Sequence, residues 1–127
     1  MTDGLMVIYN QLISNELIVS LCNDRIKFYD YPETGDTNKP FIVIDPLDVP
    51  VPTVYASNDN HAYEYLYQID VESTNRMTVK EIQAEIKKEL KKLGFGQLKD
   101  GLDEYFKETK RYVDARRYQG IIKEEVL

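Results

Sequence analysis

The sequence has few of the residues from which most catalytic and metal sites are built. Its 127 residues include one histidine, one cysteine and no tryptophan. A lone cysteine excludes a disulfide within the chain. Cys22 follows Leu21 in an apolar stretch, where we expect a small buried hydrophobe in place of a nucleophile. With His61 alone, a metal site would have to be completed by carboxylates, so we expect neither a metal nor a cofactor.

The common catalytic motifs are missing too. There is no G-x-S-x-G, no H-E-x-x-H and no G-x-x-x-x-G-K-[ST] in the sequence. The G-F-G at residues 94–96 follows an expected helix instead of preceding one, so its amides form no phosphate cradle. The acids of D-G-L-D-E at residues 100–104 are of a kind that is common on protein surfaces, in contact with solvent. We predict that the protein is not an enzyme.

Long apolar runs are also missing. No stretch approaches the roughly 18 residues that a membrane-spanning helix requires, so we expect no membrane partner. The hydrophobic fraction of 43% is nevertheless close to that of ordinary globular proteins. Because a chain of this length can bury one core without covalent links, we predict a single domain over residues 1–127.

Positive charge is scarce in the first part of the chain. Residues 1–75 hold 3 Lys and Arg against 12 Asp and Glu, whereas residues 76–127 hold 13 against 10. The overall charge of −6 argues against tight nucleic-acid binding, which needs a concentrated positive field. The asymmetry favours contact between the acidic part of one copy and the basic part of the next. A lysine-rich solvated helix would account for much of the same positive excess.

Apolar spacing predicts a helix near the N-terminus. Leu5, Ile8 and Leu12 recur at spacings of three and four, and Asp3 can cap the first turn. Asn15 can cap a second short turn. The composition then changes to that of strands at residues 25–32, which end at a proline, and at residues 40–46, a β-branched run between prolines.

Residues 46–60 are predicted to form a proline-rich loop. Three prolines in seven residues exclude both a helix and a central strand. Connections of this length without structure of their own are usually functional or are ordered by a partner. Its apolar side chains are therefore candidate subunit or partner contacts: Val49, Val51, Val54 and Tyr55.

The stretch H-A-Y-E-Y-L-Y-Q-I-D-V-E, residues 61–72, alternates as a strand does. Tyr63, Tyr65 and Tyr67 share one face with apolar residues, while the opposite face is mainly polar. We predict that the tyrosines face inward and pack under the helix at residues 79–93. If they faced solvent instead, they would be the natural subunit interface.

The helix at residues 79–93 has the clearest pattern in the sequence. Its apolar residues recur at spacings of three and four, and T-V-K-E is a capping box with Thr78 as the cap. Gly94 is the expected stop. Lys80 and the later lysines are expected on the solvent side.

Periodicity leaves residues 98–120 open between a helix and a β-hairpin, because both patterns fit. Three arginines with neighbouring tyrosines could form a stacking platform for single-stranded nucleic acid. Asp114 lies between them, so an ion-paired sheet face is favoured. The arginines are the second group of candidate contacts: Arg111, Arg116 and Arg117.

The order of these segments resembles a known group of phage proteins. The segments that carry the likeness are R-I-K-F-Y-D-Y-P, Y-E-Y-L-Y-Q-I-D-V, the helix ending in L-G-F-G, and D-E-Y-F-K-E-T-K-R-Y-V-D-A-R-R-Y-Q-G. Together they resemble the head–tail joining proteins of long-tailed phages or prophages of Gram-positive bacteria. Within that group, the chain looks most like the tail terminator, or tail completion, proteins.

The resemblance implies an α+β fold. Its mixed or mainly antiparallel sheet of about four to five strands would pack against two helices, the N-terminal one and that at residues 79–93. It also implies a β-hairpin at residues 103–107 and 111–121. The expected assembly is a homo-oligomeric ring, typically a hexamer, at the head–tail joint of the virion, formed in the host cytoplasm.

The partners that the resemblance implies are the tail tube protein and the head connector or stopper protein. DNA would pass through the ring without specific binding. Two alternatives stay open: a stopper or adaptor on the head side of the same joint, and a small nucleic-acid-binding module.

Overall fold

The structure is a computed structural model that describes residues 2–54 and 61–123. Within these ranges the chain forms three helices and six strands of one sheet. The elements are α1 Gly4–Ile13, α2 Glu16–Cys22, β1 Ile26–Phe28, β2 Phe41–Pro46, β3 Val51–Val54, β4 His61–Ser73, α3 Arg76–Lys92, β5 Gly96–Phe106 and β6 Arg111–Lys123. The α+β fold predicted from the sequence is confirmed.

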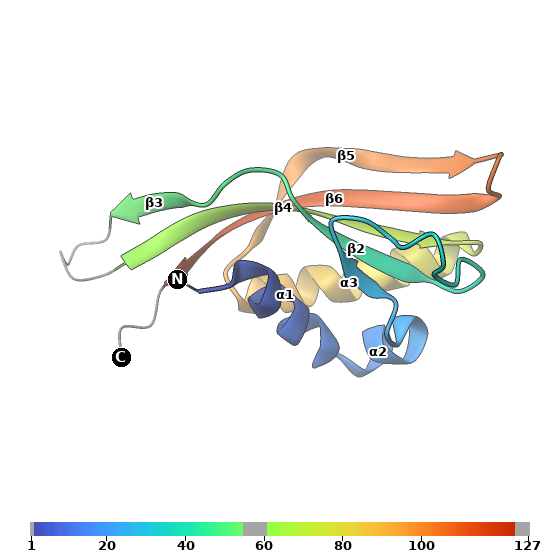
Figure 1. Cartoon of the computed structure of the whole chain (residues 1–127), viewed down its shortest axis with the longest axis horizontal. Helices are drawn as coiled ribbons and strands as arrows, with labels where there is room; N and C mark the ends of the chain where they lie inside the picture. The colour runs from blue at the N-terminus through green and yellow to red at the C-terminus, as the bar shows by residue number, and fades with distance from the viewer. Residues whose placement is uncertain (1, 55–60, 124–127) are drawn as a thin grey trace.

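The sheet is mixed but mainly antiparallel. Its strand order is β1-β2-β4-β6-β5, and β3 also pairs with β4. Only the pairing of β1 with β2 is parallel among the described strands. Figure 1 shows that the helices lie together on one side of the sheet, which we call the covered face. The other side carries no described helix and is the uncovered face.

The main core lies between the helices and the covered face. Ile69 and Val71 of β4 are fully buried in one cluster with Ile82 and Ile86 of α3. Gln83 enters the same layer, and its amide donates to the backbone carbonyls of Ile69 and Asp114, at 3.0 and 2.8 Å. The helices are therefore held to the sheet by apolar burial and by one buried polar side chain.

The N-terminal helices begin where the sequence predicts. The Asp3 carboxylate accepts from the amides of Leu5 and Met6 at the start of α1. The Asn15 side chain accepts from the Ile18 amide at the start of α2. These side chains satisfy amides that have no partner inside their own helix.

Helix α3 begins one turn earlier than predicted. Its cap is Asn75, whose side-chain oxygen accepts from the Thr78 amide at 3.1 Å. Thr78 is thus inside the helix, and the predicted capping box is wrong. The predicted stop is correct, because Gly94 has a φ of 83°, in the left-handed region that glycine adopts without strain.

Two strand predictions differ from the structure. The strand expected at residues 25–32 is limited to β1, because Tyr29 directly after it has a φ of 68° and breaks the extended backbone. The loop expected at residues 46–60 contains β3, which adds a strand to the sheet. Pro52 is compatible with β3 because this strand pairs on one side only.

The tyrosines of β4 face inward as predicted, although another helix covers them. Tyr65 and Tyr67 are 6% and 3% exposed, and Tyr63 is partly buried beside them. Both rings lie against Gly4, where a Cβ atom would collide with the Tyr67 hydroxyl. The covering element is therefore the first turn of α1, and the glycine permits its close approach.

The last two strands form the β-hairpin that the resemblance implies, so the helical alternative for residues 98–120 is wrong. Strand β5 starts at Gly96, earlier than expected, and contains a β-bulge between Gln97 and Gly101.

No described helix is by itself long and apolar enough to cross a membrane. Helices α1 and α2 reach that length and composition together, with a bend of 94° between them.

Candidate interaction surfaces

The uncovered face is built from alternate residues of β4 and β6. On β4 these residues lie opposite the buried tyrosines and Ile69, and their partners on β6 share their side of the sheet. The set is Glu64, Leu66, Gln68, Asp70 and Glu72 of β4, with Arg111, Val113, Ala115, Arg117, Gln119 and Ile121 of β6. Most of these side chains are polar, as expected for a face without helices.

Hydrogen bonds between neighbouring strands hold these polar side chains in place. The Gln119 amide donates to Glu64 at 2.7 Å, and the Arg117 guanidinium donates to Gln68 at 3.2 Å. Gln68 in turn donates to the Asp70 carboxylate at 3.0 Å. The face thus presents an ordered polar surface.

Asp70 is a carboxylate in an unfavourable place on this face. Burial has the largest effect and raises its pKa. The Gln68 hydrogen bond lowers the pKa by less, and the nearby carboxylates of Asp45 and Glu72 raise it by still smaller amounts. Neither Asp45 nor Asp70 has an ion-pair partner within residues 2–54 and 61–123. The middle of the uncovered face is therefore acidic.

The connection between β1 and β2 folds over one end of the uncovered face. Tyr31 stacks on Phe41 with ring centroids 3.8 Å apart, and the Arg111 guanidinium lies 5.9 Å from the Phe41 ring centre. Arg111 is also paired with Glu72 at 2.7 Å. These contacts make a small second core, in which Arg111 is half-buried.

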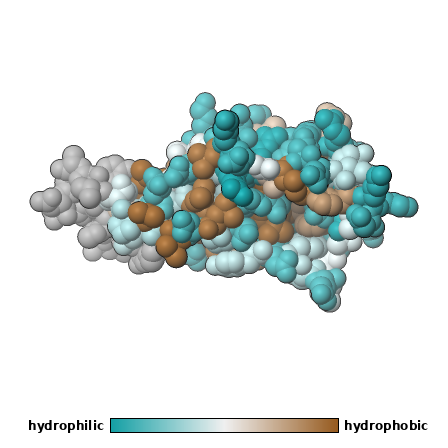
Figure 2. All heavy atoms as spheres, turned by 90° about the horizontal axis from the view of Figure 1, so that it is seen from above, coloured by the Kyte–Doolittle hydropathy of each residue, from teal (hydrophilic) through white to brown (hydrophobic). Residues whose placement is uncertain are grey.

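Apolar side chains are exposed between these polar groups. Figure 2 shows hydrophobic side chains gathered in the central part of the uncovered face, with hydrophilic ones around them. Val51, Leu102 and Ile121 are 51%, 39% and 38% exposed on this side of the sheet. Exposed apolar side chains inside a polar frame are typical of protein contact surfaces.

The candidate contacts in the segment 46–60 are only partly described. Val49, between β2 and β3, is 75% exposed, and Val51 begins β3. Val54 ends β3, where the structure describes its backbone, and Tyr55 lies outside the described residues. Val49 and Val51 are therefore the apolar contacts of this segment that the structure places on the surface.

The three candidate arginines do not form one patch. Arg111 and Arg117 lie on the uncovered face, whereas Arg116 points to the covered side and pairs with Asp114 at 2.9 Å. Each guanidinium donates to a neighbouring carboxylate or amide oxygen. Arg111 and Arg116 are thus ion-paired, on opposite faces of the sheet, and Arg117 donates to an uncharged amide oxygen. The three share no common platform for stacked bases.

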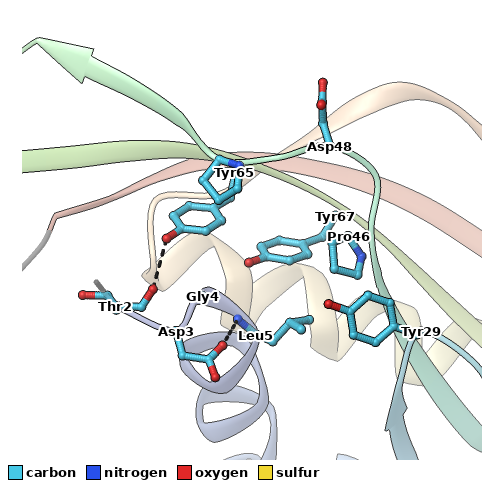
Figure 3. A pocket seen from close by; sticks show the side chains of 10 residues that line it. Thr2, Asp3, Gly4, Leu5, Tyr29, Pro46, Asp48, Tyr65 and Tyr67 are labelled. Carbon is cyan, nitrogen blue, oxygen red and sulfur yellow. Dashed lines mark hydrogen bonds between the residues drawn. The ribbon is translucent and has the colours of Figure 1, made fainter.

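A cavity of about 390 Å³ lies beside the N-terminus of α1 (Figure 3). It is lined by the buried tyrosines, by Tyr29, and by Pro46 and Pro50 at the junction of β2 and β3. The Tyr65 hydroxyl donates to the backbone carbonyl of Thr2 at 3.2 Å. Burial raises the pKa of Tyr67. The lining is mainly apolar and has no paired acid and base.

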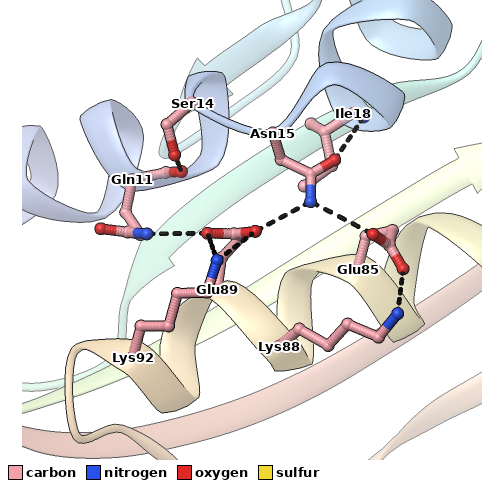
Figure 4. Close-up of polar contacts among 8 residues, drawn as sticks. All are labelled: Gln11, Ser14, Asn15, Ile18, Glu85, Lys88, Glu89 and Lys92. Carbon is pink, nitrogen blue, oxygen red and sulfur yellow. Dashed lines mark hydrogen bonds and ion pairs between the residues drawn. The ribbon is translucent and has the colours of Figure 1, made fainter.

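A buried carboxylate joins the two N-terminal helices to α3 (Figure 4). Glu89 is 5% exposed and accepts from Gln11 at 2.7 Å, from Asn15 at 2.9 Å and from Lys92 at 3.2 Å. Hydrogen bonds from Asn15 and Gln11 lower the pKa of Glu89, more than burial raises it. This cluster fixes α1 and α2 on α3.

One buried thiol lies apart from these surfaces. Burial raises the pKa of the Cys22 thiol to about 12, so this side chain is a core residue. Within the described part of the chain, no group of three or more His, Cys, Asp or Glu side chains could hold a metal ion. What the structure presents is a set of ordered surfaces.

Comparison with known proteins gives a match in fold and none in sequence. No protein-family model and no curated protein sequence matches the chain. Among solved structures, a chain from the virion of a native gene transfer agent particle has the same fold, with a TM-score of 0.61. The alignment covers 92% of each chain at 10% sequence identity. The chain therefore has the fold of a virion component.

Proposed function

We propose that this protein is a structural protein of a phage or prophage virion. In this proposal it caps the tail tube and joins the tail to the head connector as an oligomeric ring, without catalysis. The observation that carries the proposal is the shared fold, which covers 92% of both chains, with a chain of a gene transfer agent virion. The segments quoted above support the finer assignment to the tail terminator proteins of long-tailed phages of Gram-positive bacteria.

The surfaces support a role in protein contact. The uncovered face combines fixed polar side chains with exposed apolar ones, and Val49 and Val51 are exposed beside it. A ring uses head-to-tail interfaces, in which one patch meets a different patch on the neighbour. The expected partners are further copies of the chain, the tail tube protein and the connector or stopper protein.

The net charge suits a ring through which DNA passes. The chain carries −6 overall, so its surface repels the phosphate backbone. The arginines that could bind nucleic acid are engaged by Glu72, Asp114 and Gln68. We therefore expect no shift of labelled DNA or RNA at low salt, and a shift that weakens steeply with salt would favour the nucleic-acid-binding alternative.

The test is assembly of the purified protein. Light scattering and negative-stain micrographs should show rings, alone or after addition of the tail tube protein. Only monomers at high concentration, with the tube protein present, would contradict the proposal. Separate pull-downs with tail tube protein and with connector protein distinguish the tail terminator from a stopper or adaptor on the head side.

A further inference from the structure

A groove opens between α3 and the β-bulge of β5. Its volume is about 570 Å³, within the range of about 300–1,000 Å³ that is typical of binding pockets. The bulge is built into the strand, because a Cβ atom at Gly101 would collide with the backbone oxygen of Ala115. The groove is therefore a fixed feature of the hairpin.

The floor of the groove is electrically neutral and its rim is cationic. Lys80 pairs with Asp103 and Asp114 at 2.7 Å each, and Arg116 pairs with Asp114. Two lysines of the rim, Lys87 and Lys99, are exposed and have no ion-pair partner in the described part of the chain.

Two further charges bear on the groove. Lys91, one turn after Lys87 on α3, is exposed and unpaired among the described residues, although it is not part of the groove lining. Asp100 is the remaining carboxylate of the groove. The rim is therefore positive overall and fits a negatively charged protein segment.

The same chain presents a negatively charged segment at the opposite edge of its sheet. The turn at residues 30–36, D-Y-P-E-T-G-D, carries three exposed carboxylates and no cation. Its backbone is already ordered, since the Gly35 amide donates to the Pro32 carbonyl and the Tyr31 hydroxyl donates to the Asp36 carbonyl. A preordered segment loses little conformational entropy when it docks. We call it the acidic turn.

We propose that the acidic turn of one copy docks in the groove between α3 and β5 of the next copy. This inference rests on the proposed ring. The turn packs on β2, whereas the groove lies at β5, at the other end of the strand order β1-β2-β4-β6-β5. Two different patches at opposite sheet edges form a head-to-tail contact, and such a contact gives a ring when its rotation closes.

Two charge-reversed proteins test the contact. The groove variant carries Lys87→Glu with Lys99→Glu. The turn variant carries Asp30→Lys, Glu33→Lys and Thr34→Lys, which reverses the charge of the turn and keeps the hydrogen bonds of the Tyr31 hydroxyl and of Asp36. Sedimentation velocity of the full chain, with tail tube protein if the wild type needs it, should show each variant shifted from rings to monomers. An equimolar mixture should recover the ring, because each turn then meets a groove of opposite charge.

A matched control separates a specific contact from a general charge effect. Lys107→Glu with Lys110→Glu makes the same change of charge at the turn of the β5–β6 hairpin, outside the groove, and should assemble like the wild type. Circular dichroism melting confirms that every variant is folded.

Three results would overturn the inference while leaving the ring intact. They are normal assembly of the groove variant, failure of the mixture to recover rings from folded variants, and loss of connector binding by the groove variant with rings unchanged. A wild type that never assembles would instead remove the proposed function, and the inference with it.

Discussion

The two faces of the sheet use the same strands in different ways. On the covered face, Ile69 and Val71 of β4 are fully buried under the helices. On the uncovered face, their neighbours in sequence, Asp70 and Glu72, are half-buried. Asp70 accepts from Gln68 of the same strand, and Glu72 accepts from Arg111 of β6. One strand therefore contributes to the core through one set of side chains and to the exposed surface through the other.

The difference extends to the carboxylates. Hydrogen bonds lower the pKa of Glu89 beneath the N-terminal helices, whereas burial raises the pKa of Asp70 on the uncovered face. Ionised Glu89 therefore stabilises the fold, and ionised Asp70 opposes it. The two carboxylates therefore change stability in opposite directions as the pH rises.

The largest loss of stability is expected from truncating a buried side chain of the covered face. Ile69→Ala removes a fully buried side chain and leaves a cavity beneath α3, so we expect a loss of about 2–5 kcal/mol in the free energy of unfolding. Leu66→Ala, three residues away on the uncovered face, is the matched control and should lose clearly less. Denaturant unfolding measures both, and equal losses would contradict the assignment of the faces.

Removing the buried carboxylate comes next. Glu89→Ala leaves the Gln11 amide without its acceptor and removes one of the two acceptors of the Asn15 amide, which keeps Glu85, and we expect a loss of about 1–3 kcal/mol at neutral pH. Glu81→Ala, at an exposed position of the same helix, is the control.

The effect of Glu89 should depend on pH in one direction. Because its folded pKa lies below the ordinary value of 4.5, its stabilisation is complete above that pH and is lost as the pH falls through the folded pKa. Glu89→Gln should therefore melt below the wild type at neutral pH, and the two should converge in acid. The same difference in melting temperature at every pH would show that the charge of Glu89 does not contribute to stability.

The sequence was informative where a structure depends on near neighbours. The apolar stripe of α3, the caps Asp3 and Asn15 and the alternation along β4 all follow from local spacing. The strand β3 was missed because its prolines exclude a central strand while an edge strand tolerates them. The Asn75 cap had a local signal that the nearby Thr78 capping pattern obscured.

The surfaces depend on contacts between distant residues, which periodicity does not reveal. Lys80 was expected in solvent, yet it pairs with Asp114, which lies 34 positions later. The sequence indicated an ion-paired setting for the arginines because Asp114 lies among them. It gave no sign of the groove, since the bulge forms only where β5 meets β6.

A smaller loss is expected at the second core of the uncovered face. Arg111→Ala removes the ion pair with Glu72 and the contact with the Phe41 ring, for about 1 kcal/mol. Arg117→Ala, on the same face, loses one 3.2 Å hydrogen bond to Gln68 and should cost less. If urea titrations show a larger loss for Arg117→Ala than for Arg111→Ala, the connection between β1 and β2 does not form a second core with Arg111.

The smallest effect has the opposite sign. Asp70→Asn keeps an acceptor for the Gln68 amide and removes the charge, so we expect a gain of at most about 0.5 kcal/mol at neutral pH. The folded pKa of Asp70 lies above the ordinary value of 3.8, so the neutral carboxyl carries full stability below that pH and loses it as the pH rises. The gain should therefore vanish in acid, in contrast to Glu89, where the wild type loses its advantage. If Asp70→Asn stabilises the monomer but slows ring formation, the contact surface lies on the uncovered face. If assembly is unchanged, Asp70 takes no part in the contact.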